Sequence, residues 1–112
     1  MAFLSAIEGG AGIVRQGPEA EALLARCLSA FANGSIAALY DLGVAFSTAS
    51  HGVACDLIEA HKWFNIAAAR GHEEAAWCRA DIAEEMTARE IAEAQRRARE
   101  WLKLESTDRR AA

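Results

Sequence analysis

Residues 38–71 read ALYDLGVAFSTASHGVACDLIEAHKWFNIAAARG and contain the clearest pattern in the chain. Apolar side chains recur there at three- and four-residue spacing, first as Leu39, Tyr40, Gly43 and Phe46, then as Ala60, Trp63, Phe64, Ala67 and Ala68. This spacing is typical of one face of an amphipathic helix. Residues 47–52 between the two runs are mostly small, as in a loop. The stretch therefore predicts two helices joined by a short loop.

Sequence signals for helix ends extend this pattern in both directions. Asp56 with Glu59, and Thr87 with Glu90, have the spacing of capping boxes, in which each residue bonds the other's backbone. Pro18 suits the first turn of an earlier helix, and Asn33 and Gly34 suit its end. A further helix is expected over residues 73–85, after Gly71. The expected inward residues of these flanking helices are Leu24, Cys27, Leu28 and Phe31; Ala76, Trp77, Ala80 and Ala83; and Ile91, Ala94, Ala98, Trp101 and Leu102.

The chain also aligns with itself. Placing Tyr40 on Trp77 brings Gly43 onto Ala80, an offset of 37 residues, whereas Ala60 aligns with Ala94 at an offset of 34. A repeat of this length with two helices per unit indicates an α-solenoid, in which neighbouring units bury each other's apolar faces. The expected fold is all-α, a short α-solenoid of antiparallel helix pairs with about five helices.

The repeat itself resembles a known family. The run Ala38-Leu39-Tyr40-Asp41-Leu42-Gly43, followed by Phe46, Gly52-Val53, Asp56, Glu59-Ala60, Lys62-Trp63-Phe64, Ala67-Ala68 and Gly71, is similar to the Sel-1-like repeat, a relative of the tetratricopeptide repeat. It departs in the loop, which holds about one extra residue and has Ala49 where the family usually has glycine. The resemblance, to short bacterial members, implies a right-handed superhelix and an adaptor or scaffold role without catalysis.

The same comparison suggests three segments. We expect residues 1–17 to form a flexible N-terminal arm, because they hold four of the eight glycines and lack a helical period. Residues 18–104 would form the Sel-1-like helical repeat domain. Residues 105–112 are expected to be a disordered tail.

Composition narrows the classes of function. The chain has 112 residues, of which 53% are hydrophobic and 25% charged, and its formal net charge is −4. Nucleic-acid binders usually carry a basic patch, whereas the late arginines here alternate with glutamates, which favours a salt-bridged helix face. No apolar run approaches the roughly 20 residues that span a membrane. The first sixteen residues lack the basic start of a signal peptide. Three cysteines without close pairing favour reduced thiols and a cytoplasmic protein.

Few residue combinations suggest chemistry. His51 and Cys55 have a spacing that could hold a metal, but no second pair completes four ligands. Cys78 with Asp81 and His72 could be proposed as a nucleophile with its helpers, yet no glycine-rich elbow accompanies them. We therefore expect no metal, no cofactor and no enzymatic activity, with an enzyme only a remote alternative. The three tryptophans are expected in the core.

The leading hypothesis is a protein–protein interaction scaffold. On the first helix of each unit, the residues opposite the core are Ala37, Asp41, Val44, Glu74, Cys78, Asp81 and Glu85, of which four are acidic. They predict a shallow acidic groove for a basic or mixed peptide or helix; a merely soluble face stays an alternative. A second interpretation is a structural or regulatory homo-oligomer without a separate client, paired through the apolar ends at 24–31 or 101–104.

Overall fold

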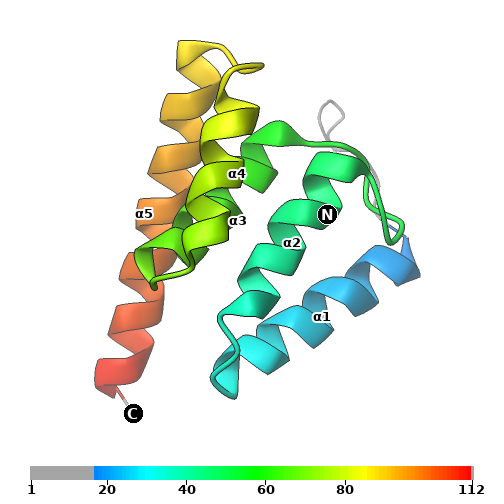
Figure 1. The fold of residues 1–112 in the computed structure, drawn as a ribbon. Coiled ribbons are helices and arrows are strands. Elements are labelled where there is room, and N and C mark those ends of the chain that lie inside the picture. Colours follow the sequence, from blue (N-terminus) through cyan, green and yellow to red (C-terminus); the bar gives the residue numbers. More distant parts are fainter. Residues whose placement is uncertain (1–16, 112) are drawn as a thin grey trace.

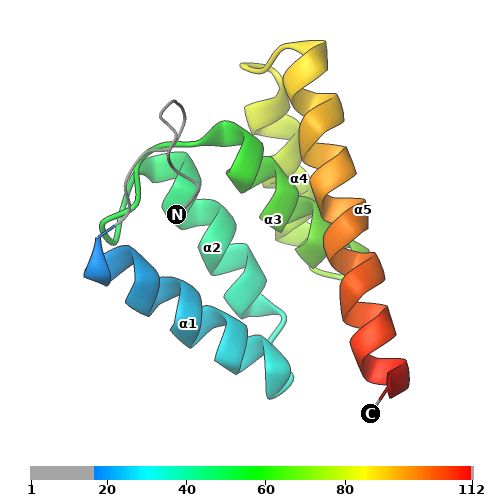
Figure 2. The same cartoon turned by 180° about the vertical axis from the view of Figure 1, so that it is seen from behind.

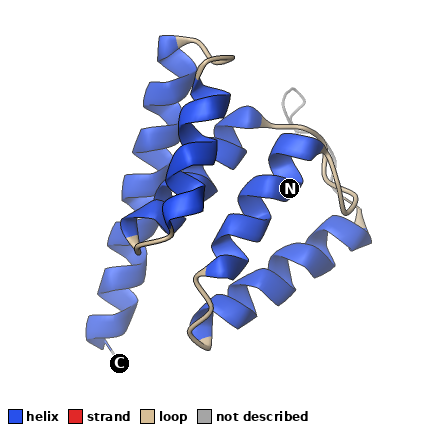
Figure 3. Ribbon diagram, in the orientation of Figure 1, coloured by secondary structure: helices blue, strands red, loops and turns tan. Residues whose placement is uncertain are grey.

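Five α-helices make up residues 17–111, the part of the chain that the computed structural model describes, and no strand occurs there (Figures 1 and 3). In chain order they are α1 (Pro18–Ala32), α2 (Ala37–Thr48), α3 (Leu57–Ala69), α4 (Glu73–Ala83) and α5 (Ala88–Ala111). The all-helical class and the five helices expected from the sequence are confirmed. The expected N-terminal arm, 1–17, lies outside the described residues except for Gly17.

Local side-chain chemistry explains where the helices begin. The Asp56 carboxylate accepts a hydrogen bond from the backbone N–H of Glu59 at 3.1 Å at the start of α3. Before α5, Thr87 and Glu90 bond each other's backbone N–H groups at 2.9 and 3.1 Å, a complete capping box. The predicted capping box of Thr87 with Glu90 is therefore fully formed. The predicted box of Asp56 with Glu59 is formed in part, with one of its two hydrogen bonds.

The loop after α2 departs from the usual helix end. Ala49 ends α2 with a left-handed backbone conformation, φ 58°, and His51 follows with φ 59°. Left-handed residues other than glycine, asparagine and aspartate are uncommon because their Cβ crowds the backbone. By contrast, Gly34 and Gly71 adopt positive φ after α1 and α3, where glycine carries no such penalty. The Ala49 substitution noted in the sequence thus leaves a strained turn in this loop.

Helix α3 is the centre of the fold, because it packs against α2, α4 and α5, while α1 packs against α2 (Figures 1 and 2). The largest fully buried side chains are on α2 and α3: Leu39, Leu42, Phe64 and Ile66. Gly43 permits this approach, since a Cβ built on it would lie 2.5 Å from the ring of Phe64. The core therefore forms where the two helices of residues 38–71 meet.

The first and last helices also touch each other. Trp101 of α5 lies between Phe31 of α1 and Trp63 of α3, with ring centroids 5.6 Å from each. Arg70, at the end of α3, lies over the Phe31 ring and pairs with Glu105 of α5. Phe31 and Trp101, one from each of the apolar ends 24–31 and 101–104, thus meet within one chain, whereas Leu24 and Leu104 stay exposed.

The expected inward residues of α1 and α4 were partly wrong. Leu24 is 38% exposed, and its neighbour Leu23, at 4%, is the residue that packs inward on α1. On α4, Trp77 is 69% exposed and Ala80 is also exposed, whereas Ala75 is fully buried. Apolar residues lie on most sides of α4, so spacing alone does not identify its inward face. The tail expected at 105–112 is helical through Ala111, because neither glycine nor proline interrupts it. This helix also carries the structured part past the expected domain limit at Leu104.

Candidate interaction face

The six residues predicted to contact a partner lie on α2, on α4 and just after α4. Asp41, Glu74, Asp81 and Glu85 are exposed, whereas Val44 and Cys78 are half-buried. Glu85 lies beyond the end of α4, which stops at Ala83. Exposure of all four carboxylates is what a surface able to meet a charged partner needs.

Tyr40 is the point at which residues of the two helices come together. The Cys78 thiol of α4 donates a weak hydrogen bond to the Tyr40 hydroxyl, with 3.9 Å between sulfur and oxygen. Burial raises the pKa of Tyr40, and Cys78, Glu74 and Asp41 raise it further. The structure thus joins Cys78 of α4, one of the predicted residues, to Tyr40 of α2.

Negative charge is concentrated on α4 and the turn after it. Residues 73–85 hold five carboxylates and one guanidinium, a net charge of −4 that equals the formal charge of the entire chain. None of the five makes an ion pair with the side chains of residues 17–107. The guanidinium, Arg79, donates to the side-chain oxygen of Asn65 at 2.7 Å instead. We call the carboxylates of Asp41, Glu73, Glu74, Asp81, Glu84 and Glu85 the acidic face.

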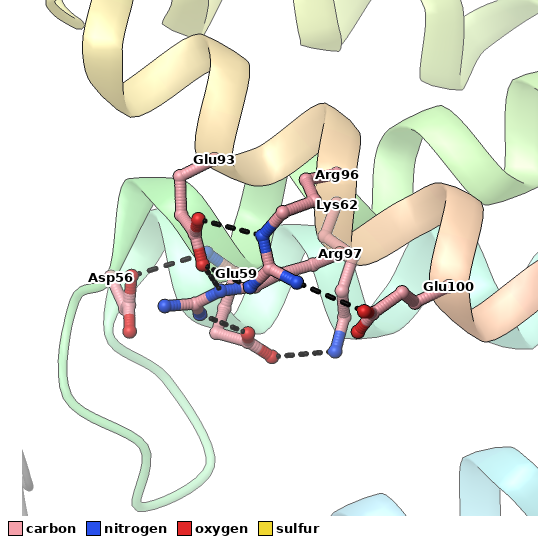
Figure 4. A network of polar contacts seen from close by, with 7 residues as sticks. All are labelled: Asp56, Glu59, Lys62, Glu93, Arg96, Arg97 and Glu100. Carbon is pink, nitrogen blue, oxygen red and sulfur yellow. Dashed lines mark hydrogen bonds and ion pairs between the residues drawn. The ribbon is translucent and has the colours of Figure 1, made fainter.

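The α3–α5 interface shows the opposite pattern, because its charges are paired (Figure 4). Arg97 bridges Glu93 of its own helix and Glu59 of α3, with both contacts at 2.7 Å. Arg96 pairs with Glu93 and, at 3.1 Å, with Glu100. Hydrogen bonds from Arg96 and Arg97 lower the pKa of Glu93 to about 2. Arg96 and Arg97 therefore form the salt-bridged helix face that the sequence predicted.

Two hollows lie beside the acidic face. An open groove between α1 and α2 includes Asp41 and Val44 together with Leu23, Arg26 and Cys27. A smaller hollow lies at the start of α4 and is lined by Gly71, His72, Glu73, Glu74 and Trp77. Sequence analysis missed Trp77 as a surface residue because tryptophan on a helix usually packs inward. The available signal was that apolar residues lie on most sides of α4, so that some of them had to stay exposed.

The histidines and the cysteine that the sequence suggested for catalysis or metal binding contact other groups in the structure. Nδ1 of His72 accepts the backbone N–H of Ala75 at 3.1 Å, and the imidazole stacks on Tyr40. Cys78 points to the Tyr40 hydroxyl, so His72 and Cys78 are not joined as base and nucleophile. His51 contacts Ser50. Across the described part of the chain, no three histidine, cysteine, aspartate or glutamate side chains are grouped to hold a metal ion.

Among the helices of residues 17–111, none is both long and apolar enough to cross a bilayer. Comparison of the chain with protein-family models, curated proteins and solved structures finds no match.

Proposed function

We propose that this protein is a non-catalytic interaction scaffold of the Sel-1-like repeat type, and that its acidic face binds a basic peptide segment or helix of another protein. The helix pair α2–α3 would be the first unit of a short α-solenoid, and α4 and α5, which both pack on α3, would be a degenerate second unit. The sequence run 38–71 and its internal alignment support this assignment. The three free cysteines fit a reducing, cytoplasmic setting.

One observation carries the proposal: the carboxylates of the acidic face have no ion-pair partner among the described residues, whereas the charges between α3 and α5 are paired. Unneutralised charge of one sign raises the local concentration of oppositely charged ligands and speeds their association. Helix α2 supplies Asp41 and helix α4 supplies Glu74, so the face spans two helices. A ligand that contacts both helices would bind only if its positive charges match the spacing of these carboxylates.

A fluorescein-labelled peptide of eight arginines is a suitable first probe, with binding followed by fluorescence anisotropy. We expect salt-sensitive binding to the wild type and at least a roughly tenfold loss in Asp41→Lys/Asp81→Lys, because a like charge at an interface repels the ligand. The matched control is Glu21→Lys/Glu100→Lys, which changes the net charge equally on exposed residues elsewhere. Equal loss in both double variants would mean that only net charge matters and would overturn the proposed face.

The second candidate function is the homo-oligomer, and exposed leucines favour it. Leu104 is 67% exposed on α5, and Leu24 is exposed on α1. Phe31 and Trp101, however, already contact each other within the chain, which uses the apolar area that a twin was expected to cover. Light scattering of the wild type and Leu104→Ser tests this candidate: a dimer that becomes a monomer in the variant would favour it over the scaffold.

A further inference from the structure

Trp77 is the most exposed large hydrophobic side chain in the described part of the chain, and the internal alignment explains why. Its counterpart in the first unit, Tyr40, is only half-exposed. Two rings cover Tyr40: Phe64, with centroids 5.7 Å apart, and His72, stacked at 4.6 Å with 16° between the ring planes. In the first unit, an aromatic ring at this position is therefore covered by two other rings.

Both covering rings are missing around Trp77. The 34-residue offset that aligns Ala60 with Ala94 places Ala98 at the position of Phe64 and Ser106 at the position of His72. Ser106 lies inside α5, which continues as a helix where the first unit turns at Gly71. Neither alanine nor serine has a ring, and α5 packs on α3 and not closely on α4, so the Trp77 indole keeps an open face beside Glu73 and Glu74.

Elsewhere the protein combines an aromatic ring, a cation and a carboxylate twice. The Lys62 ammonium lies 4.1 Å from the Trp63 ring centroid and 3.0 Å from Glu59. The Arg70 guanidinium lies 5.3 Å from the Phe31 ring centroid and pairs with Glu105. In each, the ring attracts the cation through its quadrupole while the carboxylate neutralises the charge. These two sites are complete within the chain.

The hollow at Trp77 has two of these three components. The indole is the ring, and Glu73 and Glu74 are the carboxylates. No cation among the side chains of residues 17–107 pairs with either carboxylate, and the nearest basic residue along α4, Arg79, is bonded to Asn65. The missing component is therefore a positive charge. A planar cation fits best, because Tyr40, the residue aligned with Trp77, stacks on the flat His72 ring.

We propose that Trp77, with Glu73 and Glu74, is the anchor for an arginine side chain of the basic partner segment. A guanidinium stacks on an indole face and donates two parallel hydrogen bonds to a carboxylate, whereas an ammonium is a compact, strongly hydrated point charge. The anchor rests on the proposed function, since it names the residue type by which a basic ligand attaches to the acidic face. It adds to that face an apolar contact whose strength does not vanish in salt.

Two peptides of equal length and charge, eight arginines and eight lysines, test the anchor at about 0.15 M salt. We expect the wild type to prefer the arginine peptide. Trp77→Leu keeps an apolar side chain but removes the ring, and should weaken arginine-peptide binding by roughly 3- to 30-fold, the range of a cation–ring contact. The preference over lysine should fall with it, and Trp77→Phe should restore part of it. Leu104→Ala, another exposed apolar position on a different helix, should bind like the wild type.

The outcomes separate the anchor from the acidic face. Unchanged arginine-peptide affinity in Trp77→Leu, together with lost affinity in Asp41→Lys/Asp81→Lys, would overturn the anchor and leave the face standing. Absence of binding to the wild type at any salt concentration would overturn both. A wild-type dimer that Trp77→Leu converts to a monomer, with no change in peptide affinity, would show that a second copy covers the indole and would also overturn the anchor.

Discussion

Phe31 on the first helix and Trp101 on the last place their ring centroids 5.6 Å apart, which brings the two ends of the helical array into contact. The ring of Trp63 on α3 also lies against Trp101, with centroids 5.6 Å apart. One side chain of α5 thus joins three helices. The stability of the array depends on this contact, because α1 otherwise packs mainly on α2.

Replacing Trp101 tests the closure directly. Trp101→Ala should lower the free energy of unfolding by about 3 kcal/mol, because a large ring is lost from between two others. Urea denaturation followed by circular dichroism measures the change. Trp77→Ala is the matched control, since that ring is exposed, and it should change stability by less than about 0.5 kcal/mol. Equal effects of the two substitutions would contradict the assigned packing.

The close approach of α2 and α3 depends on the absence of a side chain at Gly43. A Cβ there would lie 2.5 Å from Phe64, so even Gly43→Ala should destabilise by about 1–3 kcal/mol, despite the better helix propensity of alanine. The larger Gly43→Leu should cost at least as much. Gly17→Ala, where nothing lies within 4 Å of the added carbon, serves as control. If Gly43→Ala has the same melting temperature as the wild type, the close approach of α2 and α3 at Gly43 is refuted.

His61 should make stability depend on pH. It is buried, its Nδ1 has no hydrogen-bond partner, and burial, followed by the charge of Arg79, lowers its pKa from 6.5. Below pH 6.5 the unfolded chain therefore binds a proton that the folded chain does not, until the lower folded pKa is reached. Stability from this residue is full above pH 6.5 and declines as the pH falls below it.

Urea midpoints measured across this range would reveal the effect. His61→Leu should flatten the decline, because the replacement does not titrate. His51→Asn should keep the decline, since His51 is exposed and asparagine tolerates its left-handed backbone. The attribution to His61 fails if the wild-type slope persists in His61→Leu.

Helix α5 should act as a lid on α3. It contributes the buried residues Ala94 and Ala98, and Trp101 covers Trp63. Deletion of residues 87–112 exposes this surface, and the fragment is expected to aggregate or to bind a hydrophobic dye without a cooperative transition. A soluble 1–86 fragment that unfolds cooperatively would instead mean that α5 serves a partner.

The three cysteines should differ in reactivity towards a thiol reagent. Cys27 is buried, and burial, followed by the charge of Asp41, raises its pKa, so its reactive thiolate is scarce. Cys55 is exposed and Cys78 is half-buried, and both should react faster than Cys27. The reaction rates of three variants, each retaining one cysteine, can be measured by the absorbance change of the thiol reagent and compared. Fastest reaction at Cys27, or a disulfide under reducing conditions, would contradict the prediction.

Features that depend on neighbours along the chain were predictable. The capping box of Thr87 with Glu90 and the pairs joining Glu93 to Arg97 and Arg96 to Glu100 all lie within four residues. Their geometry follows once a helix forms. The acidic face was predictable for a similar reason, because charged side chains of a helix stay in water.

Features that depend on residues far apart in the sequence were not predictable. Leu23 and Leu24 differ by one position, and both fit an apolar stripe, but only the approach of α2 selects Leu23. The same holds for α4, where apolar residues on most sides give no preferred inward face and Trp77 lies outside the core. Rings on partner helices, absent from the local sequence, determine which aromatic residues are covered.

The amino-acid sequence thus specified five helices, most of their ends and the sign of the charge on their surfaces, since each depends on contacts within one or two turns. The contact of Phe31 with Trp101, the crowding of Phe64 against Gly43 and the exposure of Trp77 came from the packing of whole helices. Packing selects among equally apolar faces by how well their side chains fill the space between helices, and that fit exists only in three dimensions.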